Sequence, residues 1–127
     1  MDVALKEIVF PALRSMGFKG SPPHFRRAAS NRIDLLTFQF DKWGGGFVIE
    51  VARCSPIGIT TSWGKSIPPN KVTAWDVLPS FRKRIQPVDG SGRDSWFRFD
   101  AAQQPEDVAR LVLNNLSRAE TWWQMHA

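Results

Sequence analysis

Apolar and polar residues alternate most regularly between residues 32 and 54, where the chain reads RIDLLTFQFDKWGGGFVIEVARC. Apolar side chains recur at every second position on both sides of a glycine run, at Leu36, Phe38, Phe40, Phe47, Ile49 and Val51. A period of two is that of a β-strand. Three successive glycines, Gly44 to Gly46, can adopt the positive φ angles of a tight turn. The segment therefore predicts a β-hairpin around which the rest of the chain is organised.

The same pattern predicts how the two strands pair. With Lys42 opposite Phe47, the apolar side chains form a ladder on one face, and Gln39 stands opposite Glu50 on the other. A slip of one residue would move Phe38 and Phe40 to the polar face, so the pattern is expected to fix this register.

Helical periodicity appears near both ends of the chain. In the first stretch an apolar stripe follows Asp2, at Leu5, Ile8, Val9, Ala12, Leu13 and Met16. Pro11 cannot donate a backbone hydrogen bond, so we expect a kink or a second short helix at that point, and Gly17 is a natural residue to end it. Pro105, followed by two acidic residues, begins a C-terminal helix. Its buried stripe is Val108, Leu111, Val112, Leu116, Ala119 and Trp123.

Shorter strands are predicted on either side of the hairpin. Residues 24–29 read as a first strand, which places His24 at a strand edge, and residues 81–88 and 94–100 read as a second hairpin with a turn at 89–92. Residues 55–80 are rich in glycine, proline and threonine, and beyond a short alternation at 57–61 they show no regular period. A connection of this length is either functional or poorly ordered.

These elements predict one α+β domain over residues 1–127. The expected architecture is an antiparallel sheet of about five strands built on hairpins, flanked by an N-terminal and a C-terminal helix that pack on one sheet face. The other face is then open. It is expected to carry Gln39, Asp41, Glu50, Arg82, Arg84 and Trp96, with Trp63 and Trp75 at its rim.

Composition indicates a compartment. The chain has one cysteine, Cys54, so it cannot form an internal disulfide framework. No apolar run reaches membrane-spanning length, and the first ten residues lack the features of a signal peptide. We therefore expect a cytoplasmic protein with no membrane partner.

Candidate chemistry is sparse. No zinc-ligand spacing is present, the Gly44 to Gly46 run lacks the lysine and serine of a phosphate loop, and Cys54 has no histidine nearby. The sequence predicts no catalytic residue, no metal and no cofactor. Asp41 and Glu50 are expected on one face of the hairpin, where two carboxylates can serve as general acid and base. Charged residues on the solvent face of a strand are also the ordinary pattern.

Charge and aromatic content suggest a binding role. The net charge is +5, and the chain has six tryptophans and no tyrosine. Tryptophan and arginine are enriched at protein interfaces. Arginine interleaved with tryptophan on a sheet face can also bind phosphates and stack bases.

Several stretches together resemble a known family. They are LKEIVFPALRSMGFKG, then HFRR, then LLTFQFDKWGGGFVIEV, with Arg84 in a later strand before Trp96. In these features the chain resembles the bacterial family called domain of unknown function 4304. The resemblance implies an α+β fold with an antiparallel sheet between terminal helices, and it brings no established activity.

Three hypotheses for function follow. The first is a non-catalytic binding module that uses the open sheet face and the 55–80 segment, with another protein or a second copy of the chain as partner. The second is nucleic-acid binding through arginine and tryptophan on that face, and the third is an enzyme that uses Asp41 and Glu50. The candidate binding residues are Gln39, Glu50, Trp63, Trp75, Arg82, Arg84, Trp96 and Arg98.

Overall fold

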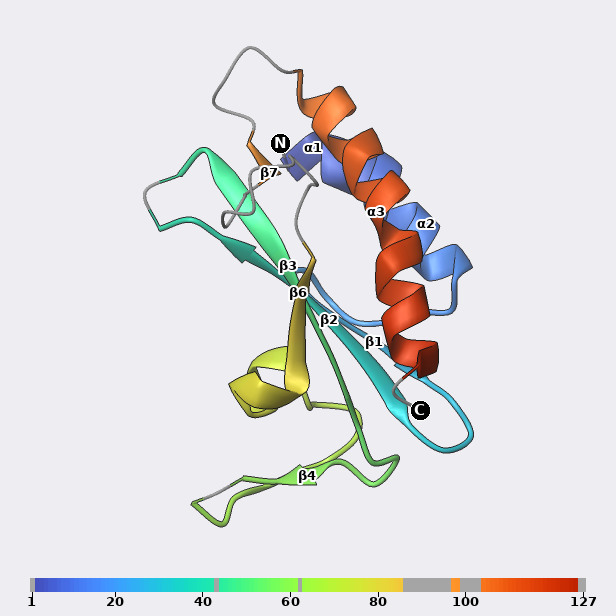
Figure 1. The fold of residues 1–127 in the computed structure, drawn as a ribbon, viewed down its shortest axis with the longest axis vertical. Coiled ribbons are helices and arrows are strands. Elements are labelled where there is room, and N and C mark those ends of the chain that lie inside the picture. The colour runs from blue at the N-terminus through green and yellow to red at the C-terminus, as the bar shows by residue number, and fades with distance from the viewer. Residues whose placement is uncertain (1, 43, 62, 86–96, 99–103, 126–127) are drawn as a thin grey trace.

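The predicted hairpin is the centre of the fold. A computed structural model describes residues 2–42, 44–61, 63–85, 97–98 and 104–125. The hairpin strands β2 (Ile33–Phe40) and β3 (Gly46–Cys54) pair antiparallel. On the outer side of β2 lies β1 (His24–Ala28), while β6 (Arg82–Ile85) and β7 (Phe97–Arg98) both pair with β3 (Figure 1). All pairings are antiparallel, which confirms the α+β prediction of about five strands.

The N-terminal helix is interrupted in the way that its proline dictates. It consists of α1 (Asp2–Ala4), a π-helical turn η1 (Leu5–Val9) and α2 (Phe10–Ser15). Because Pro11 has no N–H, the α-helical hydrogen bond to Glu7 cannot form, and the wider π turn accommodates the gap immediately before it. Gly17 ends the helix with a φ of 99°, and the amide of Phe18 donates back to the Leu13 carbonyl at 3.0 Å.

The helices pack on one sheet face, as expected. α3 (Pro105–Met125) runs beside the N-terminal helix over the sheet (Figure 1). Trp123 is fully buried, and its indole N–H donates to the Ala52 carbonyl at 2.9 Å, which ties the last turns of α3 to β3. The large side chains of this core are Leu5, Val9, Leu13, Phe18, Phe25, Leu36, Phe38, Phe47, Ile49, Val51, Ile85, Phe97, Val112, Leu116 and Trp123.

The predicted hairpin register is wrong by two residues. Phe40, not Lys42, stands opposite Phe47, so Thr37 rather than Gln39 faces Glu50. The loop is wider than expected because the Asp41 amide donates to the Gly46 carbonyl at 2.8 Å and the intervening glycines take positive φ. A shift of two residues keeps every side chain on its predicted face.

The second face of the sheet is not open along its whole length. The 55–81 segment, which we call the covering segment, folds back over this face. It contains β4 (Ile59–Thr60), β5 (Ser66–Ile67) and the 3-10 turns η2 (Ala74–Asp76) and η3 (Pro79–Phe81). β4 and β5 pair with each other in a small separate sheet and do not extend the hairpin. A second core forms between this segment and the sheet, from Ile33, Leu35, Ala52, Val72, Ala74 and Val77. β2 is therefore apolar on both faces over its first half.

The remaining strand predictions are met in part. Within the strand predicted at 81–88, β6 covers Arg82–Ile85 and Phe81 belongs to η3, while residues 86–88 lie outside the described residues. Phe97 is buried and stacks on Phe47, with ring centroids 5.2 Å apart. The predicted turn at 89–92, Trp96 and Phe99 fall outside the described residues. Among the helices that are described, none has both the length and the apolar character needed to cross a bilayer.

Candidate functional site

Two arginines fasten the 72–77 part of the covering segment to opposite edges of the sheet. Arg26 on β1 donates from Nε and Nη2 to the Val72 carbonyl at 3.3 and 3.1 Å. Arg82 on β6 donates from Nε to the Val77 carbonyl at 2.6 Å and from Nη2 to the Trp75 carbonyl at 3.1 Å. The two arginines stand at the ends of one cross-strand row, so the segment spans the sheet between them.

The turn between these anchors is closed by its own side chains. Thr73 and Asp76 form a capping box around η2, in which the Thr73 amide donates to the Asp76 carboxylate at 2.8 Å. The Thr73 hydroxyl donates to the same oxygen at 3.2 Å. The acidic group nearest to this turn is thus already occupied by local hydrogen bonds.

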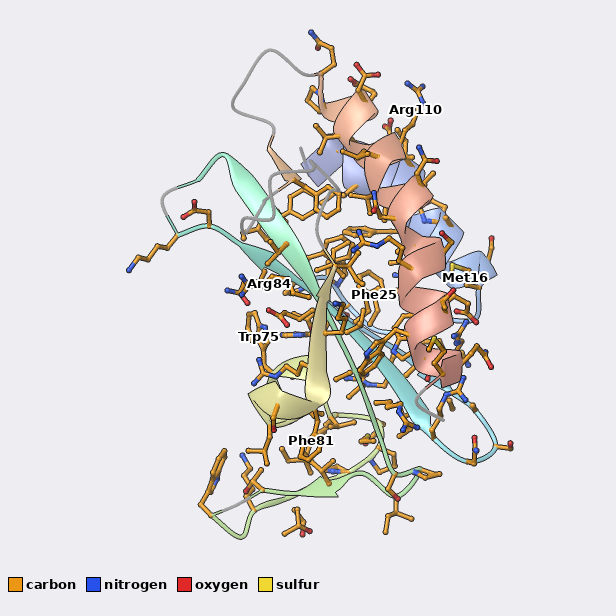
Figure 2. The ribbon with its side chains drawn as sticks, viewed as in Figure 1. Met16, Phe25, Trp75, Phe81, Arg84 and Arg110 are labelled. Atoms are coloured by element: carbon orange, nitrogen blue, oxygen red, sulfur yellow. The ribbon has the colours of Figure 1, made fainter. Side chains whose placement is uncertain are left out.

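A row of polar residues crosses the sheet beside the covering segment. His24, Thr37, Glu50 and Arg84 occupy directly opposed positions on four adjacent strands. His24 Nδ1 and the Thr37 hydroxyl are 2.9 Å apart, and Arg84 Nε donates to Glu50 Oε1 at 3.1 Å. Figure 2 shows Arg84 on the side of the sheet away from the helices, near Trp75. These groups satisfy one another, and Glu50 is only 7% exposed.

Burial governs the electrostatics at one end of this row. The His24 ring meets the Trp75 ring edge-on, with centroids 4.9 Å apart. Burial lowers the pKa of His24 below its ordinary value; the Asp76 carboxylate opposes this shift and the Arg26 guanidinium adds to it. The neutral imidazole is therefore the form that the folded structure favours.

The two hairpin carboxylates are far apart. The Asp41 amide bonds to Gly46, four residues from Glu50 along β3, which corresponds to about 13 Å of strand. Glu50 is ion-paired with Arg84. An acid–base pair made of Asp41 and Glu50 does not fit this geometry.

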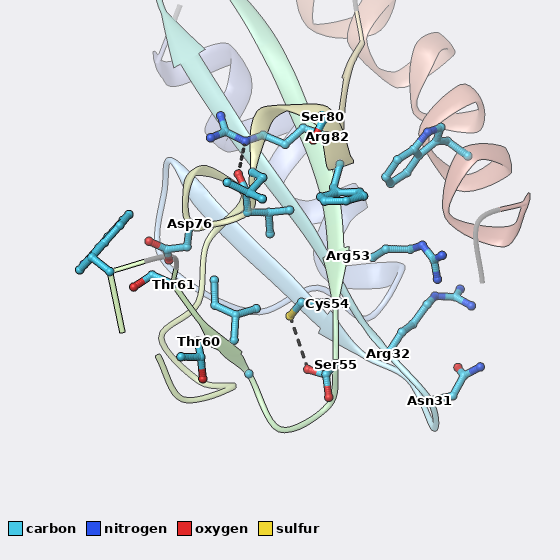
Figure 3. Close-up of a pocket in the computed structure, with 17 residues that line it drawn as sticks. Asn31, Arg32, Arg53, Cys54, Ser55, Thr60, Thr61, Asp76, Ser80 and Arg82 are labelled. Carbon is cyan, nitrogen blue, oxygen red and sulfur yellow. Dashed lines mark hydrogen bonds between the residues drawn. The ribbon is translucent and has the colours of Figure 1, made fainter. Parts of the chain in front are cut away.

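A hollow in the described surface lies where β3 runs past the start of β6. It is a cleft of about 820 Å³, which we call the β3-edge cleft. It is lined by Asn31, Arg32, Arg53, Cys54, Ser55, Gly58, Ile59, Thr60, Thr61, Trp63, Asp76, Val77, Leu78, Ser80, Phe81, Arg82 and Trp122 (Figure 3). The cleft reaches α3 on one side of the sheet and the covering segment on the other.

Large apolar side chains surround this cleft. Trp63, Leu78 and Phe81 are 75%, 54% and 64% exposed. Exposed apolar residues are ordinary when they are scattered, but three that gather at one concave site are characteristic of an interaction surface.

The main chain at the cleft has an unpaired strand edge. On the β6 side, ladder pairing of β3 runs from Ile49 to Ala52 and stops. Among the described residues, Arg53 and Cys54 have no strand partner on that side, because the chain before Arg82 turns away into η3. An unpaired edge of this kind can accept an added extended segment.

Three arginines line the cleft: Arg82 on β6, which holds backbone carbonyls, Arg53 on β3, and Arg32 in the turn before β2. Arg32 donates through Nε to Asp34 at 2.6 Å. Arg53 is half-buried and, within the part of the chain that the structure describes, makes no ion pair. Figure 3 shows the side chains of Arg32 and Arg53 extending in the same direction beside Asn31.

Cys54, which lines the cleft, has the properties of an unreactive thiol. Burial, reinforced by the nearby Asp76 carboxylate, raises the pKa of Cys54 to about 11. Its thiol donates to the Ser55 carbonyl at 3.5 Å. A thiol with this pKa is almost entirely protonated near neutrality and is a poor nucleophile.

Residues 9–126 match the model of a family described as Domain of unknown function (DUF4304). The chain belongs to the DUF4304 family. Searches of the curated proteins and of the solved structures found no match. The match to DUF4304 includes the whole β3-edge cleft and both arginine anchors of the covering segment.

The predicted binding residues fall into separate groups in this DUF4304 domain. Glu50, Arg84 and Trp75 lie together in or beside the polar row, and Gln39 lies further along the same face of β2. Trp63 and Arg82 belong to the β3-edge cleft instead. Trp96 is outside the described residues, and for Arg98 only the strand position next to Gly46 is described.

Sequence reasoning missed Arg53, Leu78 and Phe81. One signal for Arg53 was present, because Phe47, Ile49 and Val51 alternate toward the helices and Arg53 is the next position of that series. A charged residue at the end of an apolar alternation marks a place where the strand leaves the core. No comparable signal exists for Leu78 and Phe81, which lie in a segment without periodicity. No group of three or more potential metal-ligand side chains gathers among the residues described.

Proposed function

We propose that this DUF4304 domain is a non-catalytic binding module that holds an extended segment of a partner protein in the β3-edge cleft. The observation that carries the proposal is the gathering of exposed Trp63, Leu78 and Phe81 around one concave site. Burying aromatic and aliphatic side chains in a pocket is the main source of affinity at protein interfaces.

The unpaired edge of β3 favours a ligand in an extended conformation. A segment that lies beside Arg53 and Cys54 would continue the sheet where β6 begins only at Arg82. Main-chain hydrogen bonds to such an edge supply affinity, and alternate side chains reach the flanking pockets. Trp63, Leu78 and Phe81 line the same cleft as this edge, so those side chains could contact them.

The chemistry of the cleft also favours binding over catalysis. The Asp76 carboxylate is held by Thr73, and the raised pKa of Cys54 disfavours the thiolate. The polar row offers Glu50 in an ion pair with Arg84. Each of these side chains is held by a partner within the fold or keeps its proton, so none is arranged to exchange a proton with a substrate.

A capture experiment with matched variants tests the proposal. The tagged domain is incubated with lysate of its source cell, with and without nuclease, and bound proteins are identified by mass spectrometry. Phe81→Ala removes an exposed ring from the cleft. Phe40→Ala removes an exposed ring from the far end of the hairpin and serves as the control.

The expected result is a discrete set of proteins that the unaltered domain and Phe40→Ala both recover, and that Phe81→Ala loses. Equal recovery by all three proteins would place the binding elsewhere on the molecule. Recovery that disappears with nuclease would replace this proposal with nucleic-acid binding.

A further inference from the structure

We infer that the segment bound in the β3-edge cleft is acidic, and that its carboxylates bind Arg53 together with Arg32. This inference rests on the proposed function, since it names the chemistry of the partner at that same site. It adds a charge requirement that the apolar residues of the cleft do not impose.

Arg53 carries a positive charge that no carboxylate among the described residues compensates. Arg53 stands directly opposite Asp34 in the β2–β3 ladder, yet both oxygens of that carboxylate are already engaged. Asp34 Oδ2 accepts two hydrogen bonds from Arg27, at 3.0 and 2.7 Å, and Oδ1 accepts one from Arg32 at 2.6 Å. The second carboxylate of this cluster, Glu120, also binds Arg27 at 2.7 Å. Among the described residues, three guanidinium groups of this cluster thus face two carboxylates.

The second argument is geometric. Arg32 lies two residues before Asp34, so it is the diagonal cross-strand neighbour of Arg53, at a spacing that long side chains bridge easily. In the described part of the chain, the hydrogen bond that Arg32 makes uses Nε alone. Its side chain, although only 9% of the residue is exposed, lines the cleft beside Arg53 and Asn31 (Figure 3). Two adjacent guanidinium forks match the planar, bidentate geometry of carboxylates.

The distribution of arginines favours an acidic peptide over a nucleic acid as the ligand. A nucleic acid is held by a series of free cations along its phosphates. Among the side chains that the structure describes, four other arginines of the sheet are engaged within the fold: Arg26 and Arg82 hold backbone carbonyls, Arg27 is bound to carboxylates, and Arg84 pairs with Glu50. Arg53 and Arg32 form a small cationic group in the same cleft as the exposed apolar side chains. That combination fits carboxylates spaced between large apolar residues.

Selection from a random peptide library displayed on phage tests this inference. The unaltered domain is immobilised, and the net charge of the enriched peptides is read from their sequences. Retention of the enriched phage is then measured on Arg53→Gln, Phe81→Ala and Lys83→Gln. Lys83 is an exposed cation on β6 outside the cleft, so its variant controls for the loss of one positive charge.

The expected outcome is enrichment of acidic peptides that contain large apolar residues. A synthetic peptide of an enriched sequence should bind Arg53→Gln about tenfold more weakly than it binds the unaltered domain or Lys83→Gln, as the loss of a charge-assisted hydrogen bond implies. Arg53→Glu should reverse the preference and enrich basic peptides. This second variant keeps the test decisive if Arg53→Gln loses affinity through local misfolding.

Two outcomes would overturn the inference, and they differ in what they leave standing. Neutral or basic peptides whose retention depends on Phe81 but not on Arg53 would leave the proposed function intact and remove the charge requirement. Enrichment that depends on neither residue, or displacement of every peptide by oligothymidylate, would remove both.

Discussion

Arg27 and Asp34 form an ion pair with a nitrogen–oxygen distance of 2.7 Å across the β1–β2 ladder, and the Asp34 side chain is fully excluded from solvent. The Arg27 guanidinium also lies 4.7 Å from the centroid of the Phe18 ring and 5.3 Å from that of Trp123. One arginine therefore joins the sheet edge to α3 and to the residues that directly follow α2. A buried carboxylate in this position is costly unless all of its partners are present.

Asp34→Asn should destabilise the domain strongly. The substitution leaves Arg27 and Arg32 with one carboxylate between them, and breaking a buried charge network typically costs about 3–5 kcal/mol of unfolding free energy. Urea denaturation monitored by tryptophan fluorescence measures this loss. Asp107→Asn is the control, because Asp107 pairs with Arg110 on the exposed face of α3 at 3.5 Å, and such pairs contribute less than about 1 kcal/mol. Equal losses in the two variants would contradict the structural role assigned to Asp34.

His24 should make stability depend on pH in a defined direction. Its pKa is lowered in the folded state, so below about pH 6.5 the unfolded chain binds more protons and stability falls as the pH falls. We expect the melting temperature to decrease between about pH 7.5 and pH 5.5, and to decrease less in His24→Gln. The difference between the two proteins isolates His24 from the carboxylates that also titrate. Parallel pH profiles would show that His24 does not couple to folding.

Cys54 should react slowly with alkylating reagents. With the pKa of the folded thiol near 11, the thiolate fraction at about pH 8 is roughly 100-fold smaller than in the unfolded chain, where the pKa is 9.0. Iodoacetamide modification followed by mass spectrometry should show this difference between native protein and protein in urea. Similar rates in the two states would mean that the cleft does not shield the thiol.

Arg82→Lys should loosen the covering segment without unfolding the domain. Lysine keeps the charge but cannot hold two carbonyls with one planar group. Hydrogen exchange should accelerate at the amides of Asp76 and Val77, which bond within η2, and stay unchanged in α3. Arg110→Lys, on the exposed face of α3, should change neither. Unchanged exchange at Val77 in Arg82→Lys would show that the anchor on that side is dispensable.

Alternation in the hairpin was sufficient to predict which side chains face the helices. Leu36, Phe38, Ile49 and Val51 lie where a period of two places them. The register could not be predicted to the residue, because a run of three glycines is compatible with more than one loop length. The observed loop is closed by hydrogen bonds from the Asp41 amide to the Gly46 carbonyl and from the Gly44 amide to the Asp41 carbonyl.

The second core and the cleft could not be predicted from local pattern. Ile33 and Leu35 occupy positions that read as the polar face, and they are buried by residues some forty positions later in a segment without periodicity. The position of Phe81 beside Arg53 depends on the same long-range return of the chain. Trp63 and Arg82, which were predicted as binding residues from their residue type, do line the cleft. The residues that line it beside them, such as Arg53 and Phe81, were not predicted.

The anchors of the covering segment have an evolutionary consequence. Arg26 and Arg82 donate to carbonyl oxygens, which every amino acid possesses, so these two contacts do not depend on which side chains the segment carries. Substitutions at the exposed positions Leu78, Ser80 and Phe81 can therefore alter the lining of the cleft while the two anchors stay in place. We expect relatives in the family to diversify their specificity through these positions, much as antibody loops do on a constant scaffold.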